Sequence, residues 1–450
     1  MLNRPFDLSV NQRTKNFNKV IRVDSDKSIS IRSFLIGSIC QKISTVKNVL
    51  ESDDVISAIT CLKKLGVKIK KIKQKNYIIF GKGLGSLAGG KNTQLNFGNS
   101  GTLARLLIGI LSTTPNINLK IKGDSSLNKR SMKKLIDLMS AFGASFSPKT
   151  RINFPLKIVS SKMPIGINYK AGVSAQLKSA VIFAGLNSYG ETKITENEKS
   201  RDHTENMLLG NTKVIQIKKG EEKVIKIDGK NQLNPININV PGDPSSAAFF
   251  VALTLLNKNS SLVIKDVGLN KTRIGFYEIL KKQKAKIKYK NFRKVNNEYR
   301  GDIIVKSCSI RPILAGKSFY VNSTDEYPIL FVMASLIKGT SVFKGIGDLA
   351  NKESNRIVEM QKILRQVGIK SKYYKNTLKI FGKGMIDAKN KKIHVPNLGD
   401  HRICMSSFVL AVLTGANLHI KNFETVNTSS PSFLKIVKSL GVKFEVKKAS

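Results

Sequence analysis

The stretch "CLKKLGVKIKKIKQKNYIIFGKG", Cys61 to Gly83, shows the pattern from which the chain is built. It begins as an apolar pattern of helical spacing, turns at Gly66 and continues as a β-rich segment. A glycine at this point can adopt the left-handed conformation that closes a helix before a strand begins. We therefore interpret the stretch as a helix, a turn and strands.

The same pattern recurs along the chain. A helical segment ends at a small residue and passes into a β-rich segment around Gly66, Gly143, Gly210, Ala285, Gly368 and Gly441. The "KNYIIFGKG" that follows the first copy returns as "KNTLKIFGKG" after the fifth. Six such units in 450 residues predict two domains of three units each, since one hydrophobic core rarely serves so long a chain.

A domain joint is indicated by "NVPGDPSSAAFFVALTLL", Asn239 to Leu256. Pro241 and Gly242 interrupt the preceding β-rich pattern, and Asp243 can cap the apolar helix that follows. The joint falls between the third and fourth units, so we place a domain boundary there.

The composition bounds the function. The formal net charge is +47, but the lysines are spread along the whole chain, with no basic tail and no aromatic-rich RNA-binding pattern. We therefore expect small anionic molecules, and not nucleic acid, as partners. Four scattered cysteines lack metal or disulfide spacing, so we expect buried small residues and no metal. No apolar run has membrane-spanning length, and the basic first 22 residues lack the apolar block of a secretory signal, which predicts a cytoplasmic protein.

Several predicted helices begin with small polar residues and a nearby cation. "DSDKSISIR" places Lys27 and Arg32 close to a helix start, and "GNSGTLAR" brings Arg105 one turn after a glycine. "SAQLKSA", "SRDHTE" and "DHRICM" have the same character, and Lys352 and Arg356, four apart in "KESNR", are expected to share a helix face. Each stretch alone also fits an ordinary capped helix. Together they predict a site for a ligand with more than one phosphate or carboxylate.

These motifs closely resemble those of the enolpyruvyl transferase family, in its 5-enolpyruvylshikimate-3-phosphate synthase branch. The family patterns "DKSISHR", "GNAGT..R", "SAQVKSA", "PGD.SSAAF" and "KESDR" stand here as "DKSISIR", "GNSGTLAR", "SAQLKSA", "PGDPSSAAF" and "KESNR". "SRDHTE", "DEYPIL" and "DHRICM" match as well. The matches occur in family order from Asp26 to about Phe433, nearly the whole chain.

The resemblance implies an α/β fold with two similar globular domains. Each consists of three βαβαββ-type repeats with helices surrounded by sheets (an inside-out α/β barrel), and the active site lies in the interdomain cleft. In this family the N-terminal strand belongs to the second domain. We accordingly expect residues 25–242 to form the first domain, and residues 1–24 plus 243–450 to form the second.

The implied reaction transfers the enolpyruvyl group of phosphoenolpyruvate to the 5-hydroxyl of shikimate 3-phosphate, by addition and then elimination of phosphate, without a cofactor. By motif position the catalytic residues are Lys27, Asp325 and Glu353. The residues implied to bind shikimate 3-phosphate are Lys27, Ser28, Arg32, Ser174, Ala175, Gln176, Ser200, Asp325 and Lys352. Those implied to bind phosphoenolpyruvate, the site that glyphosate occupies in this family, are Lys27, Asn99, Gly101, Thr102, Arg105, Arg130, Gln176, Arg356 and Arg402. We expect a monomer.

The chain departs from the family patterns at two positions described here, and two other functions are compared with the implied one. Asn355 replaces the aspartate of "KESDR", and Ser430 replaces an aromatic residue near the C-terminal end. The sister transferase that acts on UDP-N-acetylglucosamine usually carries a cysteine in a mobile loop, where this chain has "LNKRSM". An RNA-binding or RNA-end-processing protein of similar fold would suit the charge, but it would not need Asp325, Glu353 and the "DHR" residues together.

Overall fold

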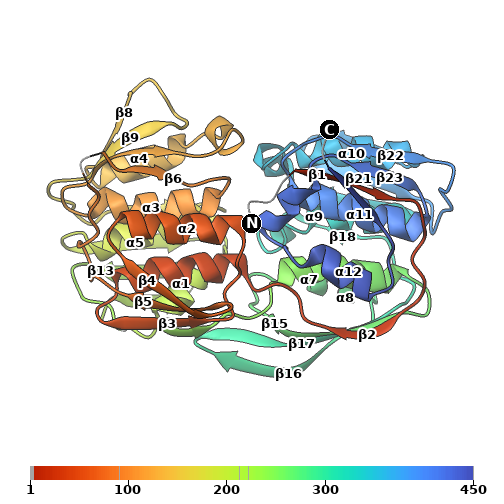
Figure 1. Ribbon diagram of the computed structural model, residues 1–450, viewed down its shortest axis with the longest axis horizontal. Coiled ribbons are helices and arrows are strands. Elements are labelled where there is room, and N and C mark those ends of the chain that lie inside the picture. Colours follow the sequence, from red (N-terminus) through yellow and green to blue (C-terminus); the bar gives the residue numbers. More distant parts are fainter. Residues whose placement is uncertain (1–4, 91, 212, 221, 449–450) are drawn as a thin grey trace. The chain divides into compact units, whose positions relative to one another are not determined.

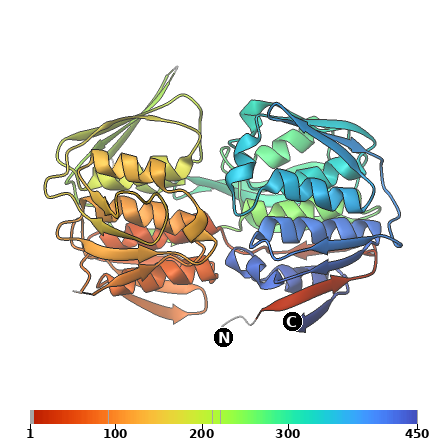
Figure 2. The same ribbon diagram turned by 90° about the horizontal axis from the view of Figure 1, so that it is seen from above.

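A computed structural model describes residues 5–90, 92–211, 213–220 and 222–448. The chain divides into two compact units (Figures 1 and 2). Unit 1 contains the described residues of Met1–Asp24, Pro241–Lys294 and Tyr299–Ser450, and unit 2 contains those of Ser25–Val240 and Val295–Glu298. Each unit has its own hydrophobic core.

One repeat of unit 2 illustrates the architecture of all. It runs β6 (Gln94–Asn96), α3 (Gly101–Thr113), β7 (Asn118–Lys122), α4 (Lys133–Ala141), β8 (Ser145–Ser147) and β9 (Leu156–Val159). The strands form a sheet of order β6-β7-β9-β8, in which the first pair is parallel and the other two are antiparallel. The parallel pair needs a crossover, and α3 supplies it. This is the predicted βαβαββ repeat.

The other repeats of unit 2 follow the same order. One consists of β10 (Asn168–Ala171), α5 (Ala175–Leu186), β11 (Glu191–Glu196), α6 (His203–Leu208), β12 (Ile215–Lys219) and β13 (Lys223–Asp228). The other consists of α1 (Lys27–Ile39), β3 (Ile43–Lys47), α2 (Asp53–Lys64), β4 (Lys68–Lys73) and β5 (Asn76–Phe80). The first strand of this repeat is β14 (Asn237–Asn239), which pairs parallel with β3. A strand from the C-terminal end of unit 2's main segment therefore completes the sheet formed by its first strands.

Unit 1 repeats the design. Its elements are α7 (Pro244–Leu256), β15 (Ser261–Gly268), α8 (Gly275–Lys282), β16 (Ile287–Val295), β17 (Glu298–Lys306), β18 (Leu314–Ala315), α9 (Tyr327–Leu336), β19 (Gly339–Lys344), α10 (Arg356–Gln366), β20 (Lys370–Tyr374), β21 (Thr377–Gly382), β22 (Lys392–Val395), α11 (His401–Thr414), β23 (Asn417–Ile420), α12 (Phe433–Ser439) and β24 (Glu445–Lys448). The first two strands, β1 (Phe6–Val10) and β2 (Asn18–Ile21), complete the sheets β22-β23-β1-β24 and β16-β17-β15-β2. The N-terminal segment therefore belongs to unit 1.

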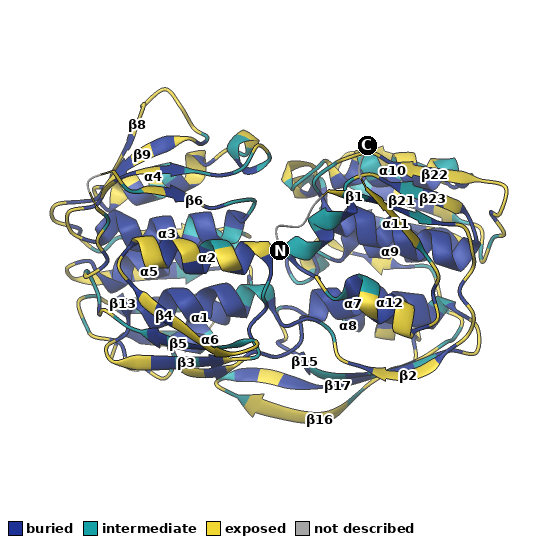
Figure 3. Cartoon of the chain, in the orientation of Figure 1, coloured by how far each residue is buried: buried dark blue, intermediate teal, exposed yellow. Residues whose placement is uncertain are grey.

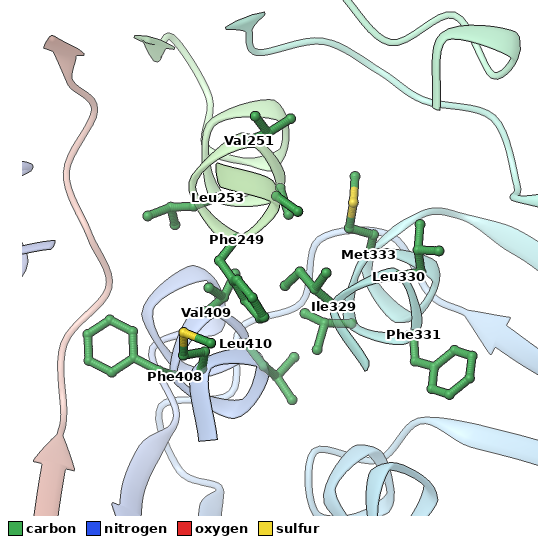
Figure 4. Close-up of a cluster of buried hydrophobic side chains, with 14 of the residues drawn as sticks. Phe249, Val251, Leu253, Ile329, Leu330, Phe331, Met333, Phe408, Val409 and Leu410 are labelled. Carbon is green, nitrogen blue, oxygen red and sulfur yellow. The ribbon is translucent and has the colours of Figure 1, made fainter. Parts of the chain in front are cut away.

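The helices that cross between parallel strands are buried on all sides. Figure 3 shows α7, α9 and α11 as buried, whereas α2 presents exposed residues along one face. Figure 4 shows Phe249, Ile329 and Phe408 from these three helices packed in one cluster. A helix that is apolar all round must lie inside, so the sheets of each unit lie outside its central helices. The predicted fold class is confirmed.

The predicted helix-closing turns are confirmed at four of six positions. Gly66, Gly143, Gly368 and Gly441 have φ between +79° and +90°. In the fourth unit the left-handed residue is Lys284, one position before Ala285. Gly210 was expected to behave like the others and does not, because the short helix α6 closes through Leu209 in a right-handed conformation.

Three of the four cysteines, Cys40, Cys61 and Cys404, are buried as predicted, whereas Cys308 is partly exposed. All four are free thiols. Within the described ranges, no helix combines the length and the apolar character needed to cross a membrane.

Candidate active site

The predicted site residues of unit 2 lie where its central helices begin. A side chain caps each of these helices: Asp26 accepts from the Ile29 N–H of α1 (2.8 Å), and Ser100 accepts from the Leu103 N–H of α3 (3.2 Å). Ser174 caps α5 in the same way. Since the amino end of a helix carries partial positive charge, three such ends favour anionic ligands.

A hydrogen-bond chain joins the starts of α3 and α5. Arg105 Nη1 donates to Gln176 Oε1 (2.7 Å) and to the carbonyl of Gly101 (3.1 Å). Gln176 Nε2 in turn donates to Thr102 Oγ1 (3.0 Å). The structure therefore brings together four residues that were predicted to bind phosphoenolpyruvate.

Arg130 also belongs to this group. It directly follows the 3₁₀ segment Leu127–Lys129. Its Nη2 donates to Asn99 Oδ1 and to Ser126 Oγ (3.2 Å). A Cβ at Gly101 would lie 2.7 Å from Arg105 Nη1 and 3.3 Å from Arg130 Nη1. Both guanidinium groups thus face the same glycine, whose missing side chain leaves room beside two positive charges.

Lys27, the first residue of α1, forms an ion pair with Asp54 on α2 (Nζ to Oδ2, 3.0 Å). The sequence reasoning missed Asp54. Asp54 lies in the first turn of α2, where an acidic residue commonly stabilises the helix dipole. Its distance from Lys27 in the sequence gives no indication of a contact. The tertiary contact gives Asp54 a second role, which is to hold the lysine ammonium in place.

Arg32 is buried and donates hydrogen bonds to three groups of the protein. Nε donates to Thr204 Oγ1 (2.8 Å), Nη2 to Ser179 Oγ (3.3 Å) and Nη1 to the carbonyl of Ser28 (3.1 Å). The predicted binding residue therefore also ties α1 to α5 and α6.

Ser200 lies in the loop between β11 and α6 and is buried. Its backbone N–H (2.8 Å) and its hydroxyl (2.6 Å) both donate to Glu196 Oε1. Glu196 was not identified from the sequence, because a glutamate at the end of a strand is unremarkable until its burial is known. Ala175 is the first residue of α5, beside the cap.

The predicted residues of unit 1 gather around Arg356. Its Nη2 donates to Glu353 Oε2 (2.7 Å), its Nε donates to Asp400 Oδ2 (2.9 Å), and Nη1 lies 3.8 Å from Asp325 Oδ1. Burial disfavours the charge, but these carboxylates outweigh it and hold the pKa of the guanidinium above its ordinary value. Two predicted catalytic carboxylates thus share one buried cation.

The expectation that Lys352 and Arg356 share a helix face is wrong. Helix α10 begins at Arg356, capped by Asn355, whereas Lys352 follows a 3₁₀ segment, Gly347–Asn351. The cap ends the helix before it can include Lys352. Lys352 is instead paired with Asp348 (2.6 Å).

Arg402 differs from every other predicted cation. It is buried at the start of α11, with its guanidinium carbon 5.8 Å from the centre of the Phe249 ring. Among the described residues, its Nε and Nη1 have no hydrogen-bond partner. Because buried donors without a hydrogen-bond partner are costly, these two nitrogens are suited to an anion.

The two departures from the family patterns have structural roles. Asn355 accepts from the Val358 N–H (3.2 Å) and so caps α10, as an aspartate would. Ser430 is buried, and its hydroxyl hydrogen-bonds to that of Ser246 (2.6 Å). In the part of the chain that is described, no three His, Cys, Asp or Glu side chains are grouped as metal ligands would be.

Comparison with known proteins gives a consistent result. The sequence pattern of the family described as EPSP synthase (3-phosphoshikimate 1-carboxyvinyltransferase) matches residues 11–437. A 3-phosphoshikimate 1-carboxyvinyltransferase of Petrotoga mobilis is 38% identical over 434 residues, which cover 95% of this chain and 98% of that protein. One of Zymomonas mobilis is 35% identical over 441 residues, 97% of each chain.

The solved structures agree. An EPSP synthase from Acinetobacter baumannii superposes with a TM-score of 0.84 at 33% identity. The superposition covers 98% of this chain and all of that one.

Proposed function

Since the chain belongs to the EPSP synthase family, we propose that it transfers the enolpyruvyl group of phosphoenolpyruvate to the 5-hydroxyl of shikimate 3-phosphate and releases phosphate. The observation that carries the proposal is the family match over residues 11–437. The two buried donors of Arg402 and the paired guanidinium groups beside Gly101 supply what two phosphorylated, carboxylated substrates require.

The reaction has two steps. The 5-hydroxyl attacks C2 of phosphoenolpyruvate while C3 gains a proton, which gives a tetrahedral intermediate. A proton then leaves C3, the C–O bond to phosphate breaks, and the enolpyruvyl double bond forms. The chain must supply a base for the hydroxyl, an acid for the methylene carbon and cations for the phosphate and carboxylate.

We assign the proton transfers to Lys27, Asp325 and Glu353. Asp325 serves the shikimate hydroxyl and Glu353 serves the carbon of phosphoenolpyruvate. Arg356 supports this assignment, because its guanidinium group lies beside both carboxylates. Lys27, held by Asp54, would contact both substrates.

The remaining predicted residues bind the substrates. Shikimate 3-phosphate would contact Ser28, Arg32, Ser174, Ala175, Gln176, Ser200 and Lys352. Phosphoenolpyruvate would contact Asn99, Gly101, Thr102, Arg105, Arg130, Gln176, Arg356 and Arg402. The capped helix starts of unit 2 and the two buried donors of Arg402 in unit 1 support these roles, because helix amino ends and guanidinium donors favour anionic groups. We also take the enzyme to be a cytoplasmic monomer without a cofactor.

A phosphate-release assay tests the proposal. Phosphoenolpyruvate and shikimate 3-phosphate together should release phosphate, and either one alone should not. The parallel reaction replaces shikimate 3-phosphate with UDP-N-acetylglucosamine. Release only with the sugar nucleotide, or with neither acceptor, contradicts the proposal.

A further inference from the structure

A cluster of four charged side chains lies buried inside unit 2. Lys178 Nζ is 2.7 Å from Glu196 Oε1 and 2.8 Å from Glu205 Oε1. Lys223 Nζ is 3.2 Å from Glu196 Oε2 and 3.1 Å from Glu205 Oε1. The side chains of Lys178, Glu196 and Glu205 are fully buried, and that of Lys223 is 9% exposed. The two ammonium groups balance the two carboxylates.

Stability alone does not explain this cluster. Buried ion pairs of this kind are often no more stabilising than apolar side chains of similar volume, because each charge loses its hydration. The four residues come from four different elements, α5, β11, α6 and β13. The cluster therefore links these elements, and its polar contacts extend to the loop between β11 and α6.

The cluster contacts Ser200 in the loop between β11 and α6. Glu196 Oε1 accepts the backbone N–H of Ser200 (2.8 Å) and its hydroxyl (2.6 Å), and Lys178 Nζ lies 3.5 Å from the carbonyl of Ser200. Both the main chain and the side chain of one candidate substrate residue are therefore fixed by this cluster. Lys178 also lies one turn into α5, whose first residues include Ala175 and Gln176.

The charge of Glu196 sets the direction of the hydroxyl hydrogen. Burial alone would raise the pKa of this carboxyl, but Lys178, Ser200 and Lys223 outweigh burial and lower it. An ionised carboxylate can only accept, so the Ser200 hydroxyl donates its single hydrogen to Glu196. Its oxygen lone pairs are left for other groups. To donate to a phosphate oxygen, the hydroxyl must turn, while the Ser200 N–H and Lys178 keep Glu196 satisfied.

We propose that Glu196 is a positioning residue for shikimate 3-phosphate: the buried Lys178–Glu196–Lys223–Glu205 cluster holds the main chain and the side chain of Ser200 at the site. The inference rests on the proposed function, which assigns Ser200 to this substrate. Glu196 acts through Ser200 and does not touch the reacting atoms.

The test compares E196Q, S200A and the double variant by the KM for each substrate and by calorimetric titration of shikimate 3-phosphate. E196Q should raise the KM and Kd for shikimate 3-phosphate about tenfold, with the KM for phosphoenolpyruvate changed less than about twofold. The effect of the double variant should be smaller than the product of the two single effects, because both substitutions remove the hydrogen bond between the Ser200 hydroxyl and the Glu196 carboxylate.

Two further variants separate positioning from folding. E191Q removes a carboxylate on the same strand, where Glu191 forms an exposed pair with Lys226, and should leave both KM values unchanged. E196Q leaves two lysines facing one glutamate, so E196Q/K223M restores the charge balance. This variant should regain thermal stability while its KM for shikimate 3-phosphate stays high.

Each other outcome overturns the inference. An unchanged KM in folded E196Q, equal increases for both substrates, additive effects with S200A, or recovery of KM in E196Q/K223M would show that the cluster is only structural. If the unmodified protein neither binds shikimate 3-phosphate nor releases phosphate with it, the proposed function fails and the inference fails with it. An active unmodified protein with an unaffected E196Q variant overturns the inference alone.

Discussion

Two arginines of unit 2 and one arginine of unit 1 contact different kinds of group. In unit 2, Arg105 donates to an amide and a backbone carbonyl, and Arg130 to an amide and a hydroxyl. In unit 1, Arg356 is enclosed by Glu353, Asp400 and Asp325. The contacts of Arg105 and Arg130 join helix starts, whereas Arg356 stabilises three carboxylates.

The role of an arginine therefore depends on its surroundings as well as on its residue type. Four arginines were assigned to phosphoenolpyruvate by motif alone, yet the surroundings of Arg356 suit the support of acid–base groups at least as well as anion binding. Arg402, whose Nε and Nη1 are buried and have no hydrogen-bond partner among the described residues, is the arginine of unit 1 that better fits anion binding.

The largest effect is expected from substitution of Lys27 in unit 2. Lys27→Met removes the charge that Asp54 holds in place, and with it a proposed proton-transfer group. We expect kcat to fall by about 10³-fold or more, while the circular dichroism spectrum stays the same. Lys352→Met, which removes a paired lysine of unit 1, should be milder. Turnover that survives Lys27→Met would assign the chemistry elsewhere.

The arginines of unit 1 provide the direct test of the comparison. Arg356→Met leaves the fully buried Asp400 carboxylate without its cation and should lower the free energy of unfolding by about 3–5 kcal/mol. Arg402→Met removes a charge that has two nitrogens without hydrogen-bond partners in the described part of the chain, and it should not destabilise the fold. Chemical denaturation measures both.

The KM for phosphoenolpyruvate is the second measurement on these variants. Arg402→Met should raise the KM for phosphoenolpyruvate by about 100-fold, because a charged hydrogen-bond partner of the substrate is lost. Equal stability of the two variants would remove the distinction between them. An unchanged KM in Arg402→Met would show that its two buried donors serve no substrate.

A smaller effect is expected at the glycine that both unit 2 arginines face. Gly101→Ala places a Cβ 2.7 Å from Arg105 Nη1, so the guanidinium must shift away from Gln176. The KM for phosphoenolpyruvate should rise about tenfold, with that for shikimate 3-phosphate nearly unchanged. Gly316→Ala, where a Cβ would meet nothing within 4 Å, is the matched control. Equal behaviour of the two variants would mean that Arg105 can move freely.

Acid denaturation tests the buried cluster of unit 2. The pKa of Glu196 lies below its ordinary value of 4.5, so its contribution to stability is fully present above that pH and is lost as the pH falls through the folded-state pKa. The E196Q variant should therefore lose less of its unfolding free energy between pH 5 and 3, about the range in which carboxyl groups titrate. E191Q should follow the unmodified protein. Parallel curves for E196Q and the unmodified protein would contradict this account.

The smallest effect concerns the departure at Asn355. Asn355→Ala removes the cap of α10 and should cost about 1 kcal/mol of unfolding free energy, whereas Asn355→Asp should change it by less than about 0.5 kcal/mol. Thermal denaturation measures the difference, and kcat should stay within about twofold for Asn355→Asp. A large loss of kcat in Asn355→Asp would show that the position does more than cap the helix.

Much of the fold was accessible from the sequence because its causes are local. The helix-to-strand turns at Gly66 and Gly368, the cap at Asp243 and the all-apolar helices after such caps follow from backbone geometry and residue chemistry. Where local geometry allowed another solution, as at Gly210 and Lys284, the prediction was wrong or displaced by one residue.

The repeats, the helix starts and the residue types that meet there could be predicted from the sequence, because these depend on neighbours along the chain. The pairing of charges became visible in the folded protein. Lys27 meets Asp54, Arg356 meets Asp400, and Ser200 meets Glu196 through contacts between separate elements. A side chain's charge state and its availability to a ligand depend on burial and on the nearest opposite charge, and both are properties of the folded chain.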